Sequence, residues 1–222
     1  MQPLVLFDLD NTLVDRRFAV TRWTASFRSR YRVSRGDEAW LTKLLADRAT
    51  PDHFEAIRSR FQLDEPASAL WDGYRTEIAA AVSCSSGVLR GLEALRKDGW
   101  RVGIATNGPT DIQWAKLRST GISERVDAVC ISAEVGTRKP DPAFFIEAIR
   151  RCNGIDEESQ AWMVGDSAVN DVSGGHGVGL RTIWVDRDAK WPEELSEPDH
   201  RVPDARAAID LLCSLGPRRS TT

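Results

Sequence analysis

Short apolar runs alternate with helix-like segments along most of the chain, and this alternation limits the possible folds more than any other feature. The runs that we interpret as strands read LVLF, RVGIATNG, VDAVCISAEVG, AWMVGD and RTIWVD. The other segments place apolar residues at helical spacing, as in VLRGLEALRKDGW, TDIQWAKLRSTG and DARAAIDLLCSLG. Buried strands separated by helices are typical of a parallel sheet covered on both faces. We therefore predict an α/β fold built on such a sheet.

One predicted helix has clear signals at both ends. In the segment DPAFFIEAIRRCNG, Asp141 is suited to the N-cap and Pro142 to the first helical position. The Asn153–Gly154 pair is suited to ending the helix, because these residues tolerate left-handed backbone conformations. We therefore expect a helix that begins at Pro142 and stops before Gly154.

Residues 16–85 interrupt the alternation. Four helix-like stretches occur there without a convincing strand between them: FAVTRWTASFRSRYRV, DEAWLTKLLADRA, DHFEAIRSRFQL and ALWDGYRTEIAAAV. We predict that 16–85 form a helical cap, inserted into a core made of 1–15 and 86–222. We interpret the tryptophans of this insertion mainly as its interior: Trp23, Trp40 and Trp71.

Composition excludes several classes of partner. The chain has 222 residues, of which 41% are hydrophobic and 28% charged, and its net charge is −3. With a pI near 5.7, it lacks the basic surface expected of a nucleic-acid-binding protein. No apolar run is long enough to span a membrane, and we see no secretory leader. We expect a cytoplasmic protein with reduced, scattered cysteines: Cys84, Cys130, Cys152 and Cys213.

Polar side chains follow the predicted strands. Asp8 and Asp10 come after the first strand, and Asp166 comes after AWMV. Thr106 and Asn107 end the strand between them. Doubly wound parallel sheets bind ligands beyond the carboxyl ends of their strands, where the winding direction reverses. We expect the Thr106 hydroxyl and the neighbouring groups of Asn107 to donate hydrogen bonds to phosphate oxygens at this edge.

The acidic residues among them require a cation. Carboxylates ~4 Å apart repel by roughly 4 kcal/mol at an effective dielectric constant near 20. Lys139 can supply one positive charge, and Mg²⁺, which prefers oxygen ligands, can supply the rest for Asp8, Asp10, Asp166 and Asp171. Asp8 and Asp10 are two apart in a segment expected to be extended, so their side chains would share a face. One could attack phosphorus while the other exchanges a proton.

Each of these sequence features also has a purely structural explanation when it is taken alone. The stretch DLDNT could be a turn held by side-chain hydrogen bonds, Lys139 a solvated lysine and Asp166 a helix N-cap. We interpret Arg16 and Arg17 as solvated charges in preference to ligands of an anionic substrate. The glycine-rich stretch GGHGVG follows a predicted helix and does not open one, so it does not indicate dinucleotide binding.

The four pieces together resemble one known family. DLDNT, ATN, RKPD and GDSAVND occur in the order and at the spacing of the four motifs of haloacid dehalogenase-like hydrolases. The resemblance covers residues 4 to about 185 of this sequence. It implies a Rossmann-like doubly wound parallel sheet with an inserted helical cap of type I. Members with an acid two residues after the nucleophile are usually phosphatases, and Asp10 holds that position.

The resemblance also implies roles for individual residues. Asp8 would be the nucleophile that forms an aspartyl-phosphate, and Asp10 the general acid and then the general base. Thr106 and Lys139 would bind the transferring phosphoryl group, and Lys139 would also orient Asp8. Mg²⁺ would be held by Asp8, the Asp10 carbonyl and Asp166. Asp171 would lie nearby, bound to the metal either directly or through water.

These observations predict a Mg²⁺-dependent phosphatase that acts on a small phosphorylated metabolite. A phosphoryl-transfer mutase of the same fold is an alternative. A phosphate-binding or receiver-like regulatory module is another, although such a module needs neither Asp10 nor a large cap. The sequence leaves open the identity of the substrate, the cap residues that select it and the oligomeric state.

Overall fold

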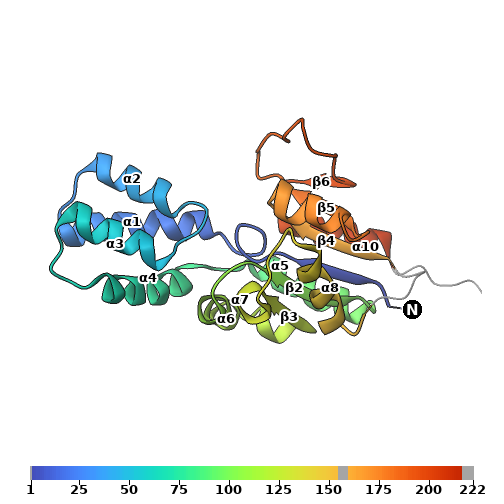
Figure 1. Ribbon diagram of the computed structural model, residues 1–222. Helices are drawn as coiled ribbons and strands as arrows, with labels where there is room; N and C mark the ends of the chain where they lie inside the picture. Colours follow the sequence, from blue (N-terminus) through green and yellow to red (C-terminus); the bar gives the residue numbers. More distant parts are fainter. Residues whose placement is uncertain (1, 155–159, 217–222) are drawn as a thin grey trace, which may run out of the picture. The chain divides into compact units, whose positions relative to one another are not determined.

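The computed structural model describes residues 2–154 and 160–216. The chain divides into two compact units, one made of Met1–Val14 with Cys84–Thr222 and the other of Asp15–Ser83. Figure 1 shows that the first unit contains the β-sheet and its helices, whereas the second is helical. The small unit therefore enters the chain directly after the first strand and its loop.

The described part of the large unit contains a six-stranded sheet with the order β3-β2-β1-β4-β5-β6. All neighbouring pairs are parallel. The predicted Rossmann-like α/β fold is confirmed, and one further strand, β6, was not expected. The strands are β1 (Leu4–Phe7), β2 (Arg101–Thr106), β3 (Ala128–Ile131), β4 (Ala161–Gly165), β5 (Arg181–Val185) and β6 (His200–Val202).

The winding direction reverses at the first strand. The chain moves from β1 outward through β2 to β3, and then returns to the other side of β1 with β4. Phe7 at the end of β1 pairs with Ile104 of β2 and Val164 of β4. The carboxyl ends of these three strands therefore meet at one edge, which is where this class of sheet binds ligands.

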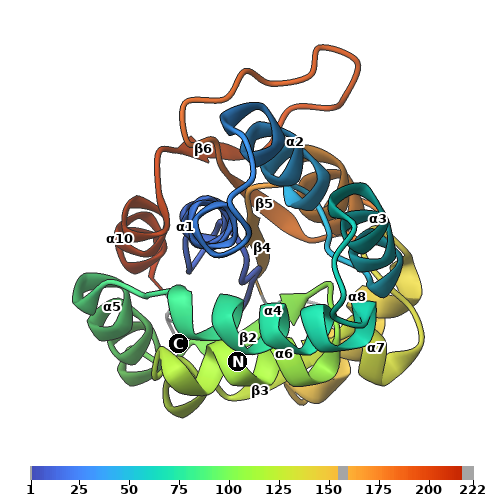
Figure 2. The same ribbon diagram turned by 90° about the vertical axis from the view of Figure 1, so that its left-hand side faces the viewer.

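Helices cover both faces of the sheet. On one face α5 and α10 pack against each other (Figure 2). They approach closely, since a Cβ atom added to Gly91 would lie 2.7 Å from Ile209. On the other face α8 packs over Leu4, Leu6 and Met163. The described helices of this unit are α5 (Ser86–Lys97), α6 (Thr110–Ser119), η1 (Ser123–Arg125), α7 (Ser132–Val135), α8 (Pro142–Arg151), the π-helical turn η2 (Ala168–Ser173), α9 (Gly174–His176) and α10 (Ala205–Leu215).

Two sequence predictions can be compared directly with these bounds. The Asp141 side chain accepts a hydrogen bond from the Ala143 N–H, and Pro142 is the first residue of α8, as predicted. The prediction of one strand over 126–136 is wrong in its second half, where α7 follows β3. Ser132 opens this helical turn, and its hydroxyl accepts a hydrogen bond from the Gly108 N–H at 3.0 Å.

The small unit consists of α1 (Arg16–Tyr31), α2 (Arg35–Leu45), α3 (Pro51–Phe61) and α4 (Ala67–Ala81), in a stretch that is described throughout. Its interior is aromatic. Trp23 is buried and contacts Phe54 and Tyr74 edge-on, with ring centroids 5.9 and 5.1 Å apart. Trp71 is half-buried at the edge of this cluster. Aromatic packing of this density gives the unit a core of its own.

The interpretation of Arg16 as a solvated charge is wrong. Its side chain is buried, and its guanidinium donates hydrogen bonds to the Leu45 and Ala46 carbonyls at 2.8 and 2.6 Å. These carbonyls lie at the C-terminal end of α2, where the helix dipole favours a cation. Arg16 therefore links the beginning of α1 to the end of α2.

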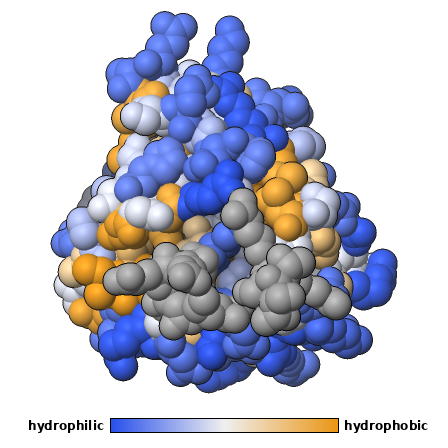
Figure 3. Space-filling model, turned by 90° about the vertical axis from the view of Figure 1, so that its right-hand side faces the viewer, coloured by the Kyte–Doolittle hydropathy of each residue, from blue (hydrophilic) through white to orange (hydrophobic). Residues whose placement is uncertain are grey.

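In the ranges 2–154 and 160–216, no single helix is both long and apolar enough to cross a membrane. Among these described residues, α4 and α5 taken together pass such a test by length and composition alone. Much of the face seen in Figure 3 is hydrophilic, with hydrophobic residues in separate patches.

We expect Phe145→Ala to lower the free energy of unfolding by about 3–5 kcal/mol, because it leaves a cavity in the core. Phe145 is fully buried against the sheet, whereas the neighbouring Ile146 is 61% exposed. Ile146→Ala is therefore the matched control, with an expected change within about 0.5 kcal/mol. Urea denaturation of the two variants checks this packing, and equal losses would contradict it.

Candidate active site

The loop after β1 places two of the predicted acidic residues. The Asp8 N–H still bonds to the sheet, donating to the Val164 carbonyl at 2.8 Å. The chain then turns, with Leu9 buried and Asn11 at a positive φ of 62°. Asparagine tolerates this left-handed conformation better than most residues. The extended segment that we expected across Asp8 and Asp10 therefore ends at Phe7.

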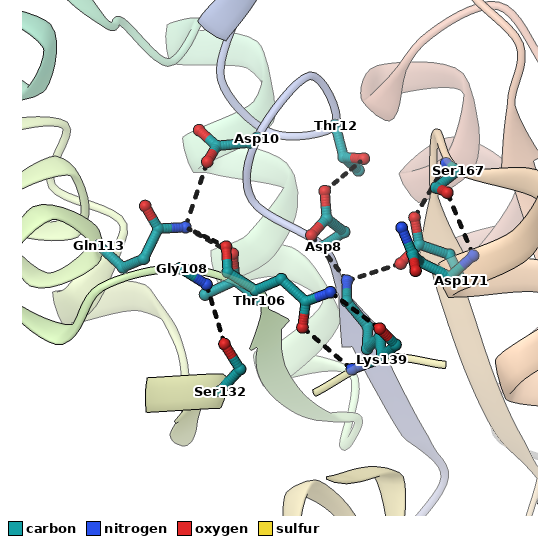
Figure 4. Close-up of polar contacts among 12 residues, drawn as sticks. Asp8, Asp10, Thr12, Thr106, Gly108, Gln113, Ser132, Lys139, Ser167 and Asp171 are labelled. Carbon is teal, nitrogen blue, oxygen red and sulfur yellow. Dashed lines mark hydrogen bonds and ion pairs between the residues drawn. The ribbon is translucent and has the colours of Figure 1, made fainter. Parts of the chain in front are cut away.

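A buried lysine joins two of the acids. Lys139 Nζ lies 2.7 Å from Asp8 Oδ1 and 2.6 Å from Asp171 Oδ1, and only 2% of the Lys139 side chain is exposed (Figure 4). The remaining carboxylate oxygens also have donors. Asp8 Oδ2 accepts from the Thr12 hydroxyl at 3.2 Å, and Asp171 Oδ2 accepts from the Ser167 N–H at 3.0 Å. This network fixes both carboxylates.

Burial and neighbouring charges have opposite effects on the pKa values of Asp8 and Lys139. Burial raises the pKa of Asp8 to about 8, although the Lys139 ammonium opposes this rise. Burial alone would lower the pKa of Lys139, but the carboxylates of Asp171 and Asp8 outweigh it, so the pKa of Lys139 is raised. Lys139 therefore remains a cation, and further positive charge near Asp8 would favour the carboxylate.

Three of the predicted metal-binding residues lie together. Asp8, Asp166 and Asp171 each offer a carboxylate oxygen, and these oxygens all lie within 4.8 Å of one another. Three carboxylates with one ammonium leave two negative charges uncompensated when all are ionised. A hard divalent cation fits this set, because it prefers oxygen ligands and carries the missing charge.

The Asp10 carboxylate is bound by different partners. Lys116 Nζ lies 2.7 and 2.8 Å from its two oxygens, and Gln113 Nε2 lies 3.2 Å from Oδ2. Both partners come from α6, and Figure 4 shows Asp10 directed toward Gln113. Asp10 thus lies next to the acidic cluster in the chain, but its side chain is paired separately.

Thr106 and Asn107 lie at the end of β2, as expected. The buried Thr106 hydroxyl accepts a hydrogen bond from Gln113 Nε2 at 2.6 Å. The Asn107 side chain is bound to the main chain of Lys139, with its amide donating to the carbonyl and accepting from the N–H, each at 3.0 Å. Asn107 therefore holds the segment that carries Lys139, a contact that the phosphate-binding interpretation did not include.

Sequence reasoning missed Gln113 and Lys116, although a signal was present. The inward face of α6 carries four buried residues, and two of them are polar: Ile112, Gln113, Lys116 and Leu117. Buried lysine and glutamine are rarely left without partners. Their position on the inner stripe of a helix that directly follows Thr106 could have indicated a functional network.

Comparisons with known proteins agree with this geometry. The model of a family described as haloacid dehalogenase-like hydrolase matches residues 3–179. The phosphoserine phosphatase of Thermus thermophilus is 39% identical over 115 residues, which are 52% of this chain and only 45% of that protein. The pyrimidine 5'-nucleotidase PynA of Streptococcus pneumoniae is 27% identical over an alignment of 223 positions that covers 94% of each chain. The crystal structure of a HAD phosphatase from Thermococcus onnurineus has a TM-score of 0.68 at 26% identity and covers 99% of this chain and 100% of that one.

The chain belongs to the haloacid dehalogenase-like hydrolase family, because the family model covers most of its length, including the segments of all four motifs. Its relatives include phosphatases and nucleotidases from several organisms. At the level of enzyme class, the prediction of a phosphoric monoester hydrolase is confirmed.

We expect Gly165→Ala to weaken binding of a divalent cation, because a methyl group there would lie 2.2 Å from the Asp171 carboxyl group. At 100 times its dissociation constant, Mg²⁺ should add ~2.7 kcal/mol to the stability of the unaltered protein. Thermal melts in Mg²⁺ and in EDTA measure this gain, which should shrink in Gly165→Ala. Gly73→Ala is the control, since its new methyl group would meet nothing within 4 Å. The same gain in both variants would count against a metal site beside Asp171.

Proposed function

We propose that this protein is a Mg²⁺-dependent phosphatase that hydrolyses a small phosphorylated metabolite through an aspartyl-phosphate on Asp8. The observation that carries the proposal is the buried Asp8–Lys139–Asp171 arrangement beside Asp166, at the edge where the winding of the sheet reverses. It combines a nucleophilic carboxylate, a fixed cation and oxygen ligands for a metal. Thr106 adds a hydroxyl at the adjacent strand end.

In the first step, an oxygen of Asp8 attacks phosphorus, and the bond between phosphorus and the leaving oxygen breaks. Asp10 gives its proton to that oxygen, so an alcohol departs and a phosphoryl group stays on Asp8. Lys139 and Thr106 interact with the oxygens of the transferring group, where negative charge is spread in the transition state. Fixed charges of this kind stabilise the transition state without having to reorganise.

In the second step, water attacks the phosphorus of phospho-Asp8. Asp10 takes a proton from this water, the bond between phosphorus and the Asp8 oxygen breaks, and inorganic phosphate is released. Asp8 and Asp10 return to their starting forms, so the two steps balance. This division of work needs one residue to act first as an acid and then as a base.

We propose that Mg²⁺ is held by Asp8, Asp166 and the Asp10 carbonyl. When bound, it supplies positive charge that favours the ionised nucleophile and neutralises phosphate oxygens. Both oxygens of Asp171 already accept hydrogen bonds, from Lys139 and from the Ser167 N–H. Because each carboxylate oxygen has a further lone pair, Asp171 could contact the metal directly or through water while it holds Lys139.

We propose that Asp15–Ser83 is the cap and that its side chains select the leaving group. Two supporting facts are its separate aromatic core and its insertion directly after the loop that carries Asp8 and Asp10. The named relatives act on phosphoserine and on pyrimidine nucleotides. Their substrates share a phosphate monoester and differ in the leaving group. We infer a small phosphorylated metabolite as the substrate class on this basis.

We also propose that the protein works in the cytoplasm. Its four cysteines are free thiols, which suits a reducing compartment. Burial raises the pKa of Cys130 to about 11 and that of Cys152 to about 12, so both remain protonated and unreactive at neutral pH.

Rates on two kinds of substrate test the proposed function. We expect Mg²⁺-dependent, EDTA-sensitive hydrolysis of p-nitrophenyl phosphate, which Asp8→Asn abolishes. Asp10→Asn should lose more activity on a sugar phosphate than on the aryl phosphate, because an alkyl leaving group needs its proton more. Positioned acid–base help is typically worth ~10²–10⁴-fold. Wild-type rates in Asp10→Asn on both substrates would contradict its role, and an inactive wild-type protein would contradict the function.

A further inference from the structure

Lys116 is a buried cation to which the steps above give no role. It lies on the inner face of α6, and only 3% of its side chain is exposed. Its ammonium donates to both oxygens of Asp10, at 2.7 and 2.8 Å, and to Gln113 Oε1 at 2.9 Å. A buried ion pair of this kind adds little net stability, because desolvation offsets most of the attraction. Its geometry therefore suggests a use other than stability.

The contacts of Lys116 also fix the orientation of Gln113. An ammonium can only donate hydrogen bonds, so the amide oxygen of Gln113 must face Lys116. The amide nitrogen then faces Thr106 Oγ1 at 2.6 Å and Asp10 Oδ2 at 3.2 Å. Because the Thr106 hydroxyl accepts from this nitrogen, its own proton points elsewhere and can be donated to a phosphate oxygen.

The backbone at Gly108 leaves room for the Gln113 side chain. A Cβ atom added to Gly108 would lie 3.0 Å from the Gln113 side chain, which is closer than nearly all real contacts of this kind. Gly108 also has a positive φ of 155°. The loop after β2 therefore passes close to the Gln113 amide, which also lies 3.5 Å from the Asn107 carbonyl.

We propose that Lys116 and Gln113 are positioning residues for the phosphatase reaction. Lys116 holds the ionised Asp10 carboxylate in place to take a proton from water in the second step, and Gln113 links it to the Thr106 hydroxyl. The inference rests on the proposed function, because it gives these two residues a task only if Asp10 and Thr106 have theirs. In this proposal, Lys116 and Gln113 do not contact the substrate themselves.

A double-mutant cycle tests whether Lys116 acts through Asp10. We measure kcat and KM on p-nitrophenyl phosphate with Mg²⁺ for the wild type, Lys116→Met, Asp10→Asn and the double variant. Lys116→Met should lower kcat by ~10–100-fold, a part of the usual acid–base contribution, with little change in KM. The double variant should be no slower than Asp10→Asn within ~3-fold, since coupled residues do not contribute independently.

Two further variants separate positioning from structural damage. Lys116→Arg keeps the cation and should recover part of the lost kcat. Lys97→Met removes an exposed lysine at the end of α5 and should leave both constants unchanged. Thermal melts confirm folding, and if Lys116→Met does not fold, the same cycle is run with Lys116→Gln.

The outcomes distinguish this inference from the proposed function. If the fold-losses of kcat in the two single variants multiply in the double variant, the positioning role is wrong. A wild-type rate in Lys116→Met would also overturn it. Both results leave the proposed phosphatase function standing. A wild-type protein that does not hydrolyse the aryl phosphate overturns both. An increase in KM with no change in kcat would also contradict the inference, because it would place Lys116 in ground-state binding of substrate.

Discussion

The arrangement of the large unit's polar edge depends on one buried interaction, the ammonium of Lys139 between the carboxylates of Asp8 and Asp171. Removing one partner of such a group leaves an uncompensated buried charge, which typically costs about 3–5 kcal/mol. The three residues come from the end of β1, from the turn η2 that follows β4 and from the loop before α8, so the network ties distant segments together. When its carboxylates are ionised the network also leaves net negative charge, and this residual charge favours a metal cation at the edge.

Neighbouring residues hold this network in place. Asn107 binds the main chain of Lys139 through both ends of its amide, and Gly165 leaves the space that the Asp171 carboxyl group fills. On the other side, α6 presents a second lysine to Asp10. The site therefore contains two buried lysines with different partners. One lies against the proposed nucleophile and the other against the proposed acid and base, which keeps the two carboxylates in separate environments.

The alternation of strands and helices was readable from the sequence because buried parallel strands form short apolar runs. The Asp141 cap was readable because the chemistry of helix ends is local. The strand β6 was not, since its three residues, His200–Val202, carry little apolar pattern. The contact of Lys116 with Asp10 was also missed, because it joins residues more than 100 positions apart and depends on which face of α6 turns inward. Motif residues could be identified singly, but their pairing required the folded chain.

The central claim is that Asp8 carries the phosphoryl group. Mass spectrometry of acid-quenched protein during turnover of an aryl phosphate tests it most directly, with Asp10→Asn used to slow hydrolysis of the intermediate. We expect one phosphoryl group on the peptide that contains Asp8 in this variant, and none in Asp8→Asn. A phosphoryl group on any other residue, or its persistence in Asp8→Asn, would contradict the account.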